Sequence, residues 1–396
     1  MKFFYIDTPI RNSELRSSLK CNFHSEIIYK SQTLNDRLRD SLDSNFRFQY
    51  CNIEDVQSLK NEKGIFWCSD ILFKSYDNQK LFLEKILYSI SPFLWGNKDS
   101  YIFKGKFSDI EKFKNTENAL NDSLERISDL KSFQSIIDED FDTRYFNQIF
   151  KVEDEYIKKS EKVDKLKKEY EFLNSVPDQM KKYFISANNF ALNKDGAQYA
   201  MPKIGYLDVS RRFLNGKISE AETQRFFDEL KRYFDISKNI SFKRTGDEFN
   251  FIYSKTLERI NDFKKSKTFI ELEEIFKFQN LGSLEDNFDK LLKILKNRKK
   301  SIIDDGSIFS HGDLCLSNIL ASENFDRIVL IDPRGGSFNE SVRSIYYDFA
   351  KLSHSINGNY DKIINGFADM RFEESLNIKV NFKGDENISF SKGLKS

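Results

Sequence analysis

Three polar residues in the last third of the chain, Asp313, Asn318 and Asp332, have the types and the spacing that phosphoryl transfer from a nucleotide needs. Such a transfer needs a carboxylate that orients the attacking hydroxyl and accepts its proton, and oxygen ligands that hold Mg²⁺ against the phosphates. Asp313 and Asn318 offer a carboxylate and an amide oxygen from one tight loop. Asp332 ends an apolar strand, Ile328–Ile331, which would fix a second magnesium ligand on a rigid element.

The sequence around these residues reads HGDLCLSN and, further on, IDPRG. An aspartate, four residues, an asparagine and a later metal-binding aspartate is the pattern of the kinase catalytic loop. The alternative is a turn in which Asp313 and Asn318 only cap the backbone. A chance HGD motif with this asparagine would arise in roughly one such chain in a thousand, so the pattern favours the catalytic interpretation.

The His-Gly-Asp form of the motif resembles the aminoglycoside phosphotransferase and choline kinase family more than it resembles the protein kinases. The resemblance covers about Tyr145 to Phe372 and is specific at the catalytic loop. It implies an α+β fold with a two-lobed kinase-like domain, and ATP and Mg²⁺ as cofactors. It also implies that Asp313 is the catalytic base and that Asn318 and Asp332 are metal ligands. The nearest likeness is to kinase-like proteins of bacterial surface-polysaccharide pathways, which often follow a nucleotidyltransferase-like domain.

The same resemblance implies an upstream lysine that grips the α- and β-phosphates and a helix glutamate that holds this lysine in place. A strand-like run carries Lys158 and Lys159, and Glu169 lies on the helix that follows. Successive strand residues point to opposite faces, so one of the two lysines can enter the cleft. The apolar Ile157 before it favours Lys158. The alternative is a solvated run of charges.

A glycine loop that cradles phosphates is missing, because residues 146–155 contain no glycine. The aminoglycoside and choline kinases often lack a strict glycine loop. The segment from Ala200 to Ile204 falls where the hinge of the family binds adenine through backbone hydrogen bonds. Met201 and Ile204 are therefore candidates for contact with the nucleotide, on their order along the chain.

Three further residues are candidates for support of the site. Asp348, in the run YYDFA, matches a family aspartate that supports the catalytic loop from the next helix. His311 is expected to brace the loop rather than to transfer protons. Arg334 follows the metal aspartate by two residues and could meet a phosphate or an anionic substrate, or pair with Glu340 or Asp348.

The elements that must position these residues follow from changes in the apolar pattern. Residues 1–140 are expected to form a smaller α/β domain, and a polar helix at Thr116–Ile137 would connect it to the rest of the chain. Another helix is expected after Asp77. The expected strands of this domain are Phe3–Ile6, Glu26–Tyr29, Phe46–Tyr50, Ile65–Cys68 and Tyr101–Phe103.

Residues 141–205 are expected to form the small lobe, and residues 206–396 the helical lobe. A hairpin of Tyr145–Val152 and Glu155–Lys159 would precede a helix that begins near Val163 and ends at Pro177. Further strands are expected at Tyr183–Ala187 and Gln198–Ile204. A capping box at Ser219 and Glu222 should start one helix of the second lobe, and Leu284–Leu295 should form another. By pattern, Asn377–Phe382 and Asn387–Phe390 are strand-like.

The composition of the chain bounds its class. Its 396 residues are 39% hydrophobic and 32% charged, which is typical of a globular protein. A formal charge of +1 argues against a general nucleic-acid binder, and no apolar stretch has the length of a membrane span. Four scattered cysteines without metal-ligand spacing indicate a reduced, cytoplasmic protein. The oligomeric state cannot be read from the sequence.

The sequence therefore predicts an ATP-dependent kinase that phosphorylates a hydroxyl group of a small molecule, a sugar or an amino alcohol. A protein-directed kinase is disfavoured because Pro333–Tyr347 is short for an activation segment. A nucleotide-binding pseudokinase scaffold is disfavoured because such a protein would lack Asp313, Asn318 or Asp332, and this chain has all three. In the first domain, Cys68–Phe73 resembles the strand end of sugar nucleotidyltransferases, but their glycine-rich nucleotide loop is absent. A recognition or assembly role is expected there.

Overall fold

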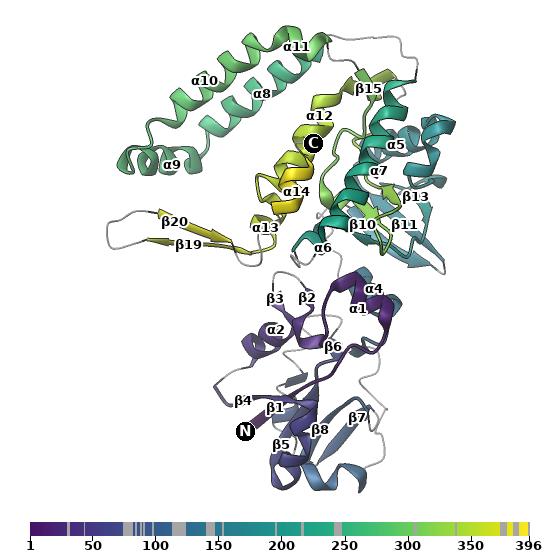
Figure 1. Cartoon of the computed structure of the whole chain (residues 1–396), viewed down its shortest axis with the longest axis vertical. Coiled ribbons are helices and arrows are strands. Elements are labelled where there is room, and N and C mark those ends of the chain that lie inside the picture. The colour runs from purple at the N-terminus through teal and green to yellow at the C-terminus, as the bar shows by residue number, and fades with distance from the viewer. Residues whose placement is uncertain are drawn as a thin grey trace. The chain divides into compact units, whose positions relative to one another are not determined.

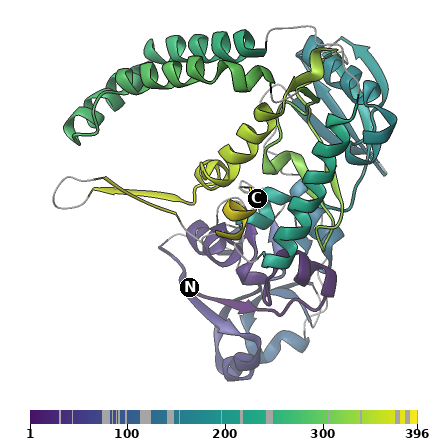
Figure 2. The ribbon, with the colours of Figure 1, turned by 45° about the horizontal axis from the view of Figure 1, so that its top comes forward.

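Helices and strands are mixed along the whole chain, as Figure 1 and Figure 2 show, and the expected α+β class is confirmed. The structure is a computed structural model. It describes residues 1–29, 32–42, 44–73, 82–83, 85–87, 89, 92–96, 99–112, 124–139, 147–152, 154–194, 196–214, 218–240, 248–304, 307–336, 339–372, 378–382 and 388–394.

The chain forms two compact units. The N-terminal unit comprises residues 1–161, 200–207 and 211–218, and the C-terminal unit comprises residues 162–199, 208–210 and 219–396. The expected domain boundaries at residues 140 and 205 remain predictions. None of the helices in the described ranges is both long enough and apolar enough to cross a membrane.

The N-terminal unit is built on a five-stranded sheet in the order β4-β1-β5-β8-β7. Its strands are β1 (Lys2–Asp7), β4 (Arg47–Asn52), β5 (Lys63–Cys68), β7 (Phe93–Gly96) and β8 (Tyr101–Lys106). β1 pairs in parallel with both β4 and β5, while β5 with β8 and β7 with β8 are antiparallel pairs. Four of the expected strands are confirmed, and buried aromatic residues of β1, β5 and β8 stack on each other.

Two expectations for this unit are corrected. The run Glu26–Tyr29 is split, because a 3₁₀ turn at His24–Glu26 comes before the short β2 (Ile28–Tyr29). The expected connector helix is wrong in its described first part, where β9 (Leu124–Arg126) pairs with β6 (Ile71–Phe73). The helix there is α4 (Leu130–Glu139). Residues 113–123 and Asp77 lie outside the described residues. The other described helices of this region include α1 (Ser13–Leu19) and α2 (Leu34–Ser41), and residues 82–83 and 85–87 are helical where the helix after Asp77 is expected.

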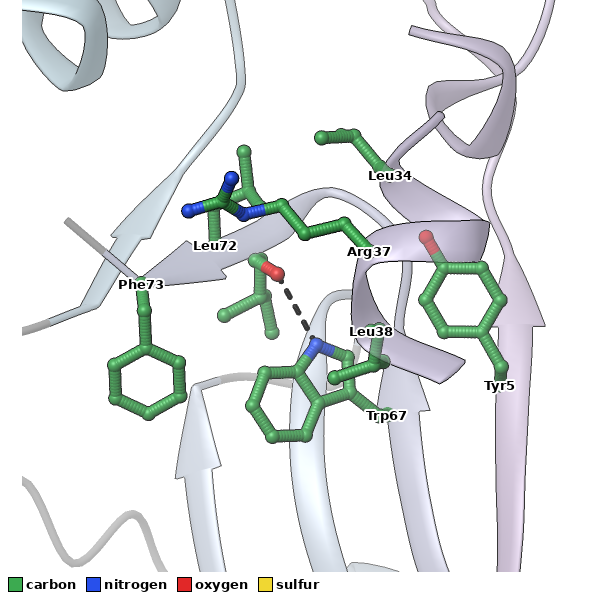
Figure 3. Close-up of a pocket in the computed structure, with 8 residues that line it drawn as sticks. Tyr5, Leu34, Arg37, Leu38, Trp67, Leu72 and Phe73 are labelled. Carbon is green, nitrogen blue, oxygen red and sulfur yellow. Dashed lines mark hydrogen bonds between the residues drawn. The ribbon is translucent and has the colours of Figure 1, made fainter. Parts of the chain in front are cut away.

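A small pocket lies between α2 and the sheet (Figure 3). The Trp67 indole donates a hydrogen bond of 3.1 Å to the Ile71 carbonyl at its edge. The cavity measures about 10 Å³, room for about one water molecule. A nucleotide or a sugar does not fit in it. The pocket therefore adds no support for a nucleotidyltransferase activity.

Buried polar residues gather where β1 and β5 end. The Asp7 carboxylate accepts hydrogen bonds from the Ser25 hydroxyl at 2.6 Å, from the Ser69 hydroxyl at 2.9 Å and from the Tyr50 hydroxyl. Asp70, the strand-end aspartate of the nucleotidyltransferase resemblance, accepts from Ser100 Oγ and Arg126 Nε at 2.8 and 2.9 Å. These carboxylates are occupied by internal donors, which favours a structural role for them.

The expected hairpin is present as β10 (Asn147–Val152) and β11 (Glu155–Ser160), in a four-stranded sheet of order β10-β11-β13-β12. The expected helix is α5 (Val163–Ser175). The expected strand Tyr183–Ala187 is wrong: Asp178–Tyr183 forms a 3₁₀ helix that buries Met180 and Tyr183, which are three residues apart. The strands follow as β12 (Asn188–Asn193) and β13 (Gly196–Pro202).

The C-terminal unit is mostly helical. Its α7 (Glu220–Lys238) begins at the expected capping box, in which Ser219 N donates to Glu222 Oε2 at 2.9 Å. The expected helix at Leu284–Leu295 is α10 (Leu284–Asn297), which runs beside α8 (Glu248–Lys264) in both views of the ribbon (Figure 1, Figure 2). The remaining helices include α9 (Lys267–Phe278), α11 (Lys299–Asp304), α12 (Ile345–Ile356) and α13 (Tyr360–Ile364).

Short strands connect the helices of this unit: β15 (Ser307–Phe309) pairs with β18 (Val342–Ser344), and β16 (Ile319–Ala321) pairs with β17 (Ile328–Leu330). In the tail, β19 (Ala368–Phe372) pairs with β20 (Ile378–Phe382), which confirms one strand-like run. The other is wrong, because Ile388–Gly393 is helix α14 and its Phe390 stacks on Phe226 of α7.

Replacing Asp7 with Ala should lower the free energy of unfolding by about 2–4 kcal/mol, because buried hydroxyl donors would lose their acceptor. Thermal unfolding of the full chain measures this loss. Asp109→Ala is the control, since that carboxylate lies at the surface and pairs with Lys112. Equal melting temperatures for the Asp7 variant and the wild type would contradict the structural role of Asp7.

Candidate active site

The motif HGDLCLSN forms a loop between β15 and β16 that ends in a 3₁₀ turn at Leu316–Asn318. Leu314 and Leu316 are fully buried on either side of the half-buried Cys315, and Asp313 is also half-buried. Alternation of buried and accessible side chains thus anchors the loop in the core by its leucines. The same alternation leaves the Asp313 carboxylate accessible.

Asp348 on α12 anchors the backbone of the loop. Its carboxylate accepts the backbone N–H of His311 at 2.9 Å and of Gly312 at 2.8 Å, and its side chain has no exposed surface. Burial raises the pKa of Asp348 to about 6, against the opposing effect of the N–H donors, so the carboxylate is ionised at neutral pH. Gly312 has φ +77°, and a Cβ there would lie 2.8 Å from the Cβ of Arg334.

His311 connects the loop to the end of β17. Its Nε2 lies 2.9 Å from the Ile331 carbonyl, and its Nδ1 accepts the N–H of Asp313 at 3.2 Å. Burial lowers the pKa of His311 to about 4, so at neutral pH the ring is uncharged and carries its proton on Nε2. A ring that is committed on both nitrogens suits the bracing role expected from the sequence.

Two backbone hydrogen bonds bring Asp332 to the loop. Ile331 N donates to the Asn318 carbonyl at 3.0 Å, and Arg334 N donates to the His311 carbonyl at 3.0 Å. Asp332 itself has φ +55°, a left-handed turn directly after β17. The negative charges of the Asp313 and Asp332 carboxylates both raise the pKa of His311, against the larger effect of burial. The structure therefore brings together the three residues that the motif singled out.

The donor set suits a hard cation that also has phosphate ligands. Asn318 Nδ2 donates to the Asp313 carbonyl at 2.9 Å, which directs the amide oxygen of Asn318 to the other side. An amide oxygen and the Asp332 carboxylate are ligands that Mg²⁺ accepts. Within the described ranges, no group of three or more His, Cys, Asp or Glu side chains could hold a metal ion. Phosphate oxygens and water would therefore have to complete the coordination.

The upstream candidates lie in different units. Lys158 on β11 is 2% exposed whereas Lys159 is half-buried, so the strand register favours Lys158 as the inward lysine. Glu169 on α5 is 4% exposed and accepts a hydrogen bond of 2.5 Å from the Tyr199 hydroxyl. Lys158 belongs to the N-terminal unit and Glu169 to the C-terminal unit. Their pairing stays a prediction.

Helix α5 is docked onto the segment that follows Asp332. Gly336 N donates to the Lys168 carbonyl at 2.9 Å. A Cβ on Gly335, at φ +81°, would lie 2.7 Å from Glu169 N, so only glycine allows this approach. Glu169 therefore sits beside the backbone just after Asp332.

The expected hinge residues Met201 and Ile204 lie at the end of β13 and just beyond it. Met201 is buried and Ile204 is half-buried. Between them, Lys203 N donates to the Asp154 carbonyl at 2.9 Å, which fixes this segment against the hairpin. Contact with a nucleotide base stays a prediction for both residues.

Sequence reasoning missed two residues of the site. Lys351 Nζ lies 2.8 Å from Asp313 Oδ1, and Tyr199 holds Glu169 as described above. The sequence could have indicated Lys351, because it follows Asp348 by three residues on the same helix and so lies on the same helix face. Arg334 packs its side chain over Gly312 and donates to the hydroxyl of Tyr347.

Comparison with known proteins adds no evidence about function to the geometry of the site. No protein-family model matches the chain, and no curated protein matches it. Among solved structures, aminoglycoside phosphotransferase APH(3'')-Id from Streptomyces rimosus is similar over 60% of this chain and 89% of its own, with 15% identity and a TM-score of 0.36.

Two other solved structures are similar at the same level. A mutant of an aminoglycoside 2'-phosphotransferase in its GDP complex matches over 60% of this chain and 81% of its own, with 13% identity and a TM-score of 0.40. Spectinomycin phosphotransferase APH(9)-Ia, in complex with ADP and spectinomycin, matches over 57% and 69%, with 13% identity and a TM-score of 0.36. Scores this low establish no relationship, so the functional case rests on the geometry of the site.

Replacing Asp348 with Asn should lower the free energy of unfolding by about 2–4 kcal/mol, because the amide would turn an N–H₂ group toward a backbone donor of the loop. Urea unfolding of the full chain measures this loss. Asp289→Asn, an exposed site on α10, should change stability by no more than about 0.5 kcal/mol. An Asp348 variant as stable as this control would show that the loop does not depend on the carboxylate.

Proposed function

We propose that this chain is an ATP-dependent kinase that transfers the γ-phosphoryl group to a hydroxyl of a small molecule, such as a sugar or an amino alcohol. The observation that carries the proposal is the joint geometry of Asp313, Asn318 and Asp332. A half-buried carboxylate and two oxygen ligands project from one backbone that is fixed by Asp348 and His311. Phosphoryl transfer depends mainly on such positioning and on charge stabilisation.

In this proposal Asp313 orients the acceptor hydroxyl and takes its proton. The acceptor oxygen forms a bond to the γ-phosphorus while the bond to the β,γ-bridging oxygen breaks, and ADP leaves with that oxygen. Lys351, 2.8 Å from Asp313, would orient the carboxylate before the transfer. Asn318 and Asp332 would hold Mg²⁺, which supplies charge neutralisation on the phosphates when bound.

The nucleotide grip is assigned to residues upstream of this loop. Lys158 would contact the α- and β-phosphates, Glu169 would hold Lys158, and the backbone at Met201 and Ile204 would receive the base. The burial of Lys158 on the inward face of β11 supports its role. We further propose a two-lobed kinase-like arrangement of residues 141–396, with residues 1–140 in recognition or assembly.

The wider setting rests on the sequence resemblance. A place in bacterial surface-polysaccharide biosynthesis is proposed on that ground, and a cytoplasmic location is proposed from the four scattered cysteines. The presence of all three residues of the motif in one constellation speaks against a pseudokinase scaffold. ATP turnover with a panel of sugars and amino alcohols, beside a panel of proteins, separates a small-molecule kinase from a protein-directed kinase.

Replacing Asp313 with Ala should leave Mg-ATP binding unchanged and lower turnover by a factor on the order of a hundred or more, because the metal ligands remain while the base is lost. Replacing Asp332 with Ala should weaken Mg-ATP binding as well as turnover. Calorimetry with Mg-ATP and a coupled assay of ADP release measure the two effects.

The control for both variants is Asp326→Ala, an exposed carboxylate in the turn between β16 and β17. It should bind and turn over Mg-ATP as the wild type does. Full activity of the Asp313 variant would refute the mechanism. Loss of Mg-ATP binding in the Asp313 variant alone would show that the base and the metal ligand have been exchanged.

A further inference from the structure

Positively charged side chains from three separate segments lie close enough to one another to lower the pKa of Lys255, and Asp313 lies close enough to oppose them. Lys255 and Arg259 come from α8, Arg334 follows Asp332, and Lys351 comes from α12. We name Lys255, Arg259, Arg334 and Lys351 the cationic cluster. All four residues belong to the C-terminal unit, so their arrangement does not depend on how the two units are placed.

Two members of the cluster meet at the hydroxyl of Tyr347. Lys255 Nζ donates to this oxygen at 2.7 Å, and a guanidinium nitrogen of Arg334 donates to the same oxygen. The Lys255 ammonium also lies 5.2 Å from the Tyr347 ring centre and 5.5 Å from that of Phe251. Two cations thus share one uncharged oxygen, an arrangement that costs electrostatic free energy until an anion joins them.

The electrostatic environment of Lys255 shows the excess of positive charge. Burial, followed by Arg334, Arg259 and Lys351 in that order, lowers the pKa of Lys255 to about 8. Asp313 opposes them, but its effect is smaller than that of each of these cations. Most of the Lys255 side chains are still charged at neutral pH. The cluster therefore presents a positive potential that the Asp313 carboxylate does not neutralise.

The position of the cluster decides what it can contact. Lys351 contacts Asp313 directly, and Arg334 packs over Gly312, which immediately precedes Asp313. If Asp313 accepts the proton of the acceptor hydroxyl, the remainder of the acceptor must lie within reach of these side chains. The phosphates of the nucleotide are expected at Asn318 and Asp332 instead.

We propose that the cationic cluster binds an oxyanion, a phosphate or a carboxylate, that belongs to the phosphoryl acceptor itself. Lysine and arginine donors around one point are the usual means of recognising such groups. The inference rests on the proposed kinase function and narrows its substrate class. The acceptor would be a phosphorylated polyol or sugar, or an acidic sugar. An amino alcohol is disfavoured, because the cluster would repel its ammonium group.

Anion binding is tested first without any nucleotide, on the full chain, with inorganic phosphate as the probe at constant ionic strength. Phosphate should raise the melting temperature of the wild type, because a ligand of the native state stabilises it. Lys255→Met keeps the apolar stem and removes the charge, so it should need about ten times more phosphate for the same rise. Lys296→Met is the control, since Lys296 also lies over a ring, that of Tyr253 at 5.3 Å.

The second arm compares acceptors that differ in charge: glycerol 3-phosphate with glycerol, and glucuronate with glucose. With Mg-ATP, the anionic partner of at least one pair should have a kcat/KM about tenfold higher or more. The preference should be lost through KM in Lys255→Met, while Mg-ATP affinity stays that of the wild type. The pair that shows the preference identifies the oxyanion as phosphate or carboxylate.

The outcomes separate this inference from the proposed function. Equal stabilisation of the wild type and the Lys255 variant by phosphate would overturn the anion site. Weaker Mg-ATP binding in Lys255→Met would overturn the assignment to the acceptor, because the cluster would then serve the nucleotide. Phosphate binding through Lys255 without any ATP turnover would refute the kinase function and, with it, the acceptor, but would leave the anion site.

Discussion

The buried carboxylate of Asp348 is the constraint on which the rest of the site depends. A buried charge is costly unless donors surround it, and here the donors are the backbone N–H groups of His311 and Gly312. The loop must therefore adopt the one conformation that presents both groups to α12. In that conformation the His311 ring reaches the Ile331 carbonyl and the Asp313 side chain emerges beside Lys351. One interaction thus fixes the places of Asp313, the proposed base, and of Asp332, the proposed metal ligand.

Much of the fold could be predicted because its signals are local. Strand β1, helix α5 and the capping box of α7 follow from apolar spacing and from one pair of polar residues. The failures occurred where tertiary contact overrides the local pattern. Asp178–Tyr183 buries an i, i+3 pair in a 3₁₀ turn, and the tail at Ile388–Gly393 is a helix that packs Phe390 against α7. Helix α7, which Phe390 packs against, is far from the tail in sequence.

The same distinction applies to the candidate site. The motif of Asp313, Asn318 and Asp332 is compact in sequence, because one loop and one strand carry all of it, and the structure places its members together. Lys255 lies on α8, far from the motif in sequence, and only the folded chain brings it to Tyr347. Tyr199 likewise reaches Glu169 from another element. Contacts of this kind have no pattern in a single sequence.

Helix α12 carries residues of the proposed catalytic site and of the cationic cluster at positions set by its periodicity. Asp348 and Lys351 are three residues apart and share the face that meets the catalytic loop. Tyr347 is one position earlier, which turns its side chain about 100° away from that of Asp348, toward Lys255 of α8. Lys351 of the cationic cluster thus shares the face of Asp348, whereas Tyr347 and its contact with Lys255 lie on another face of the same helix. We therefore expect changes at Tyr347 or Lys255 to alter the proposed charge preference for the acceptor while the N–H groups of His311 and Gly312 still donate to Asp348.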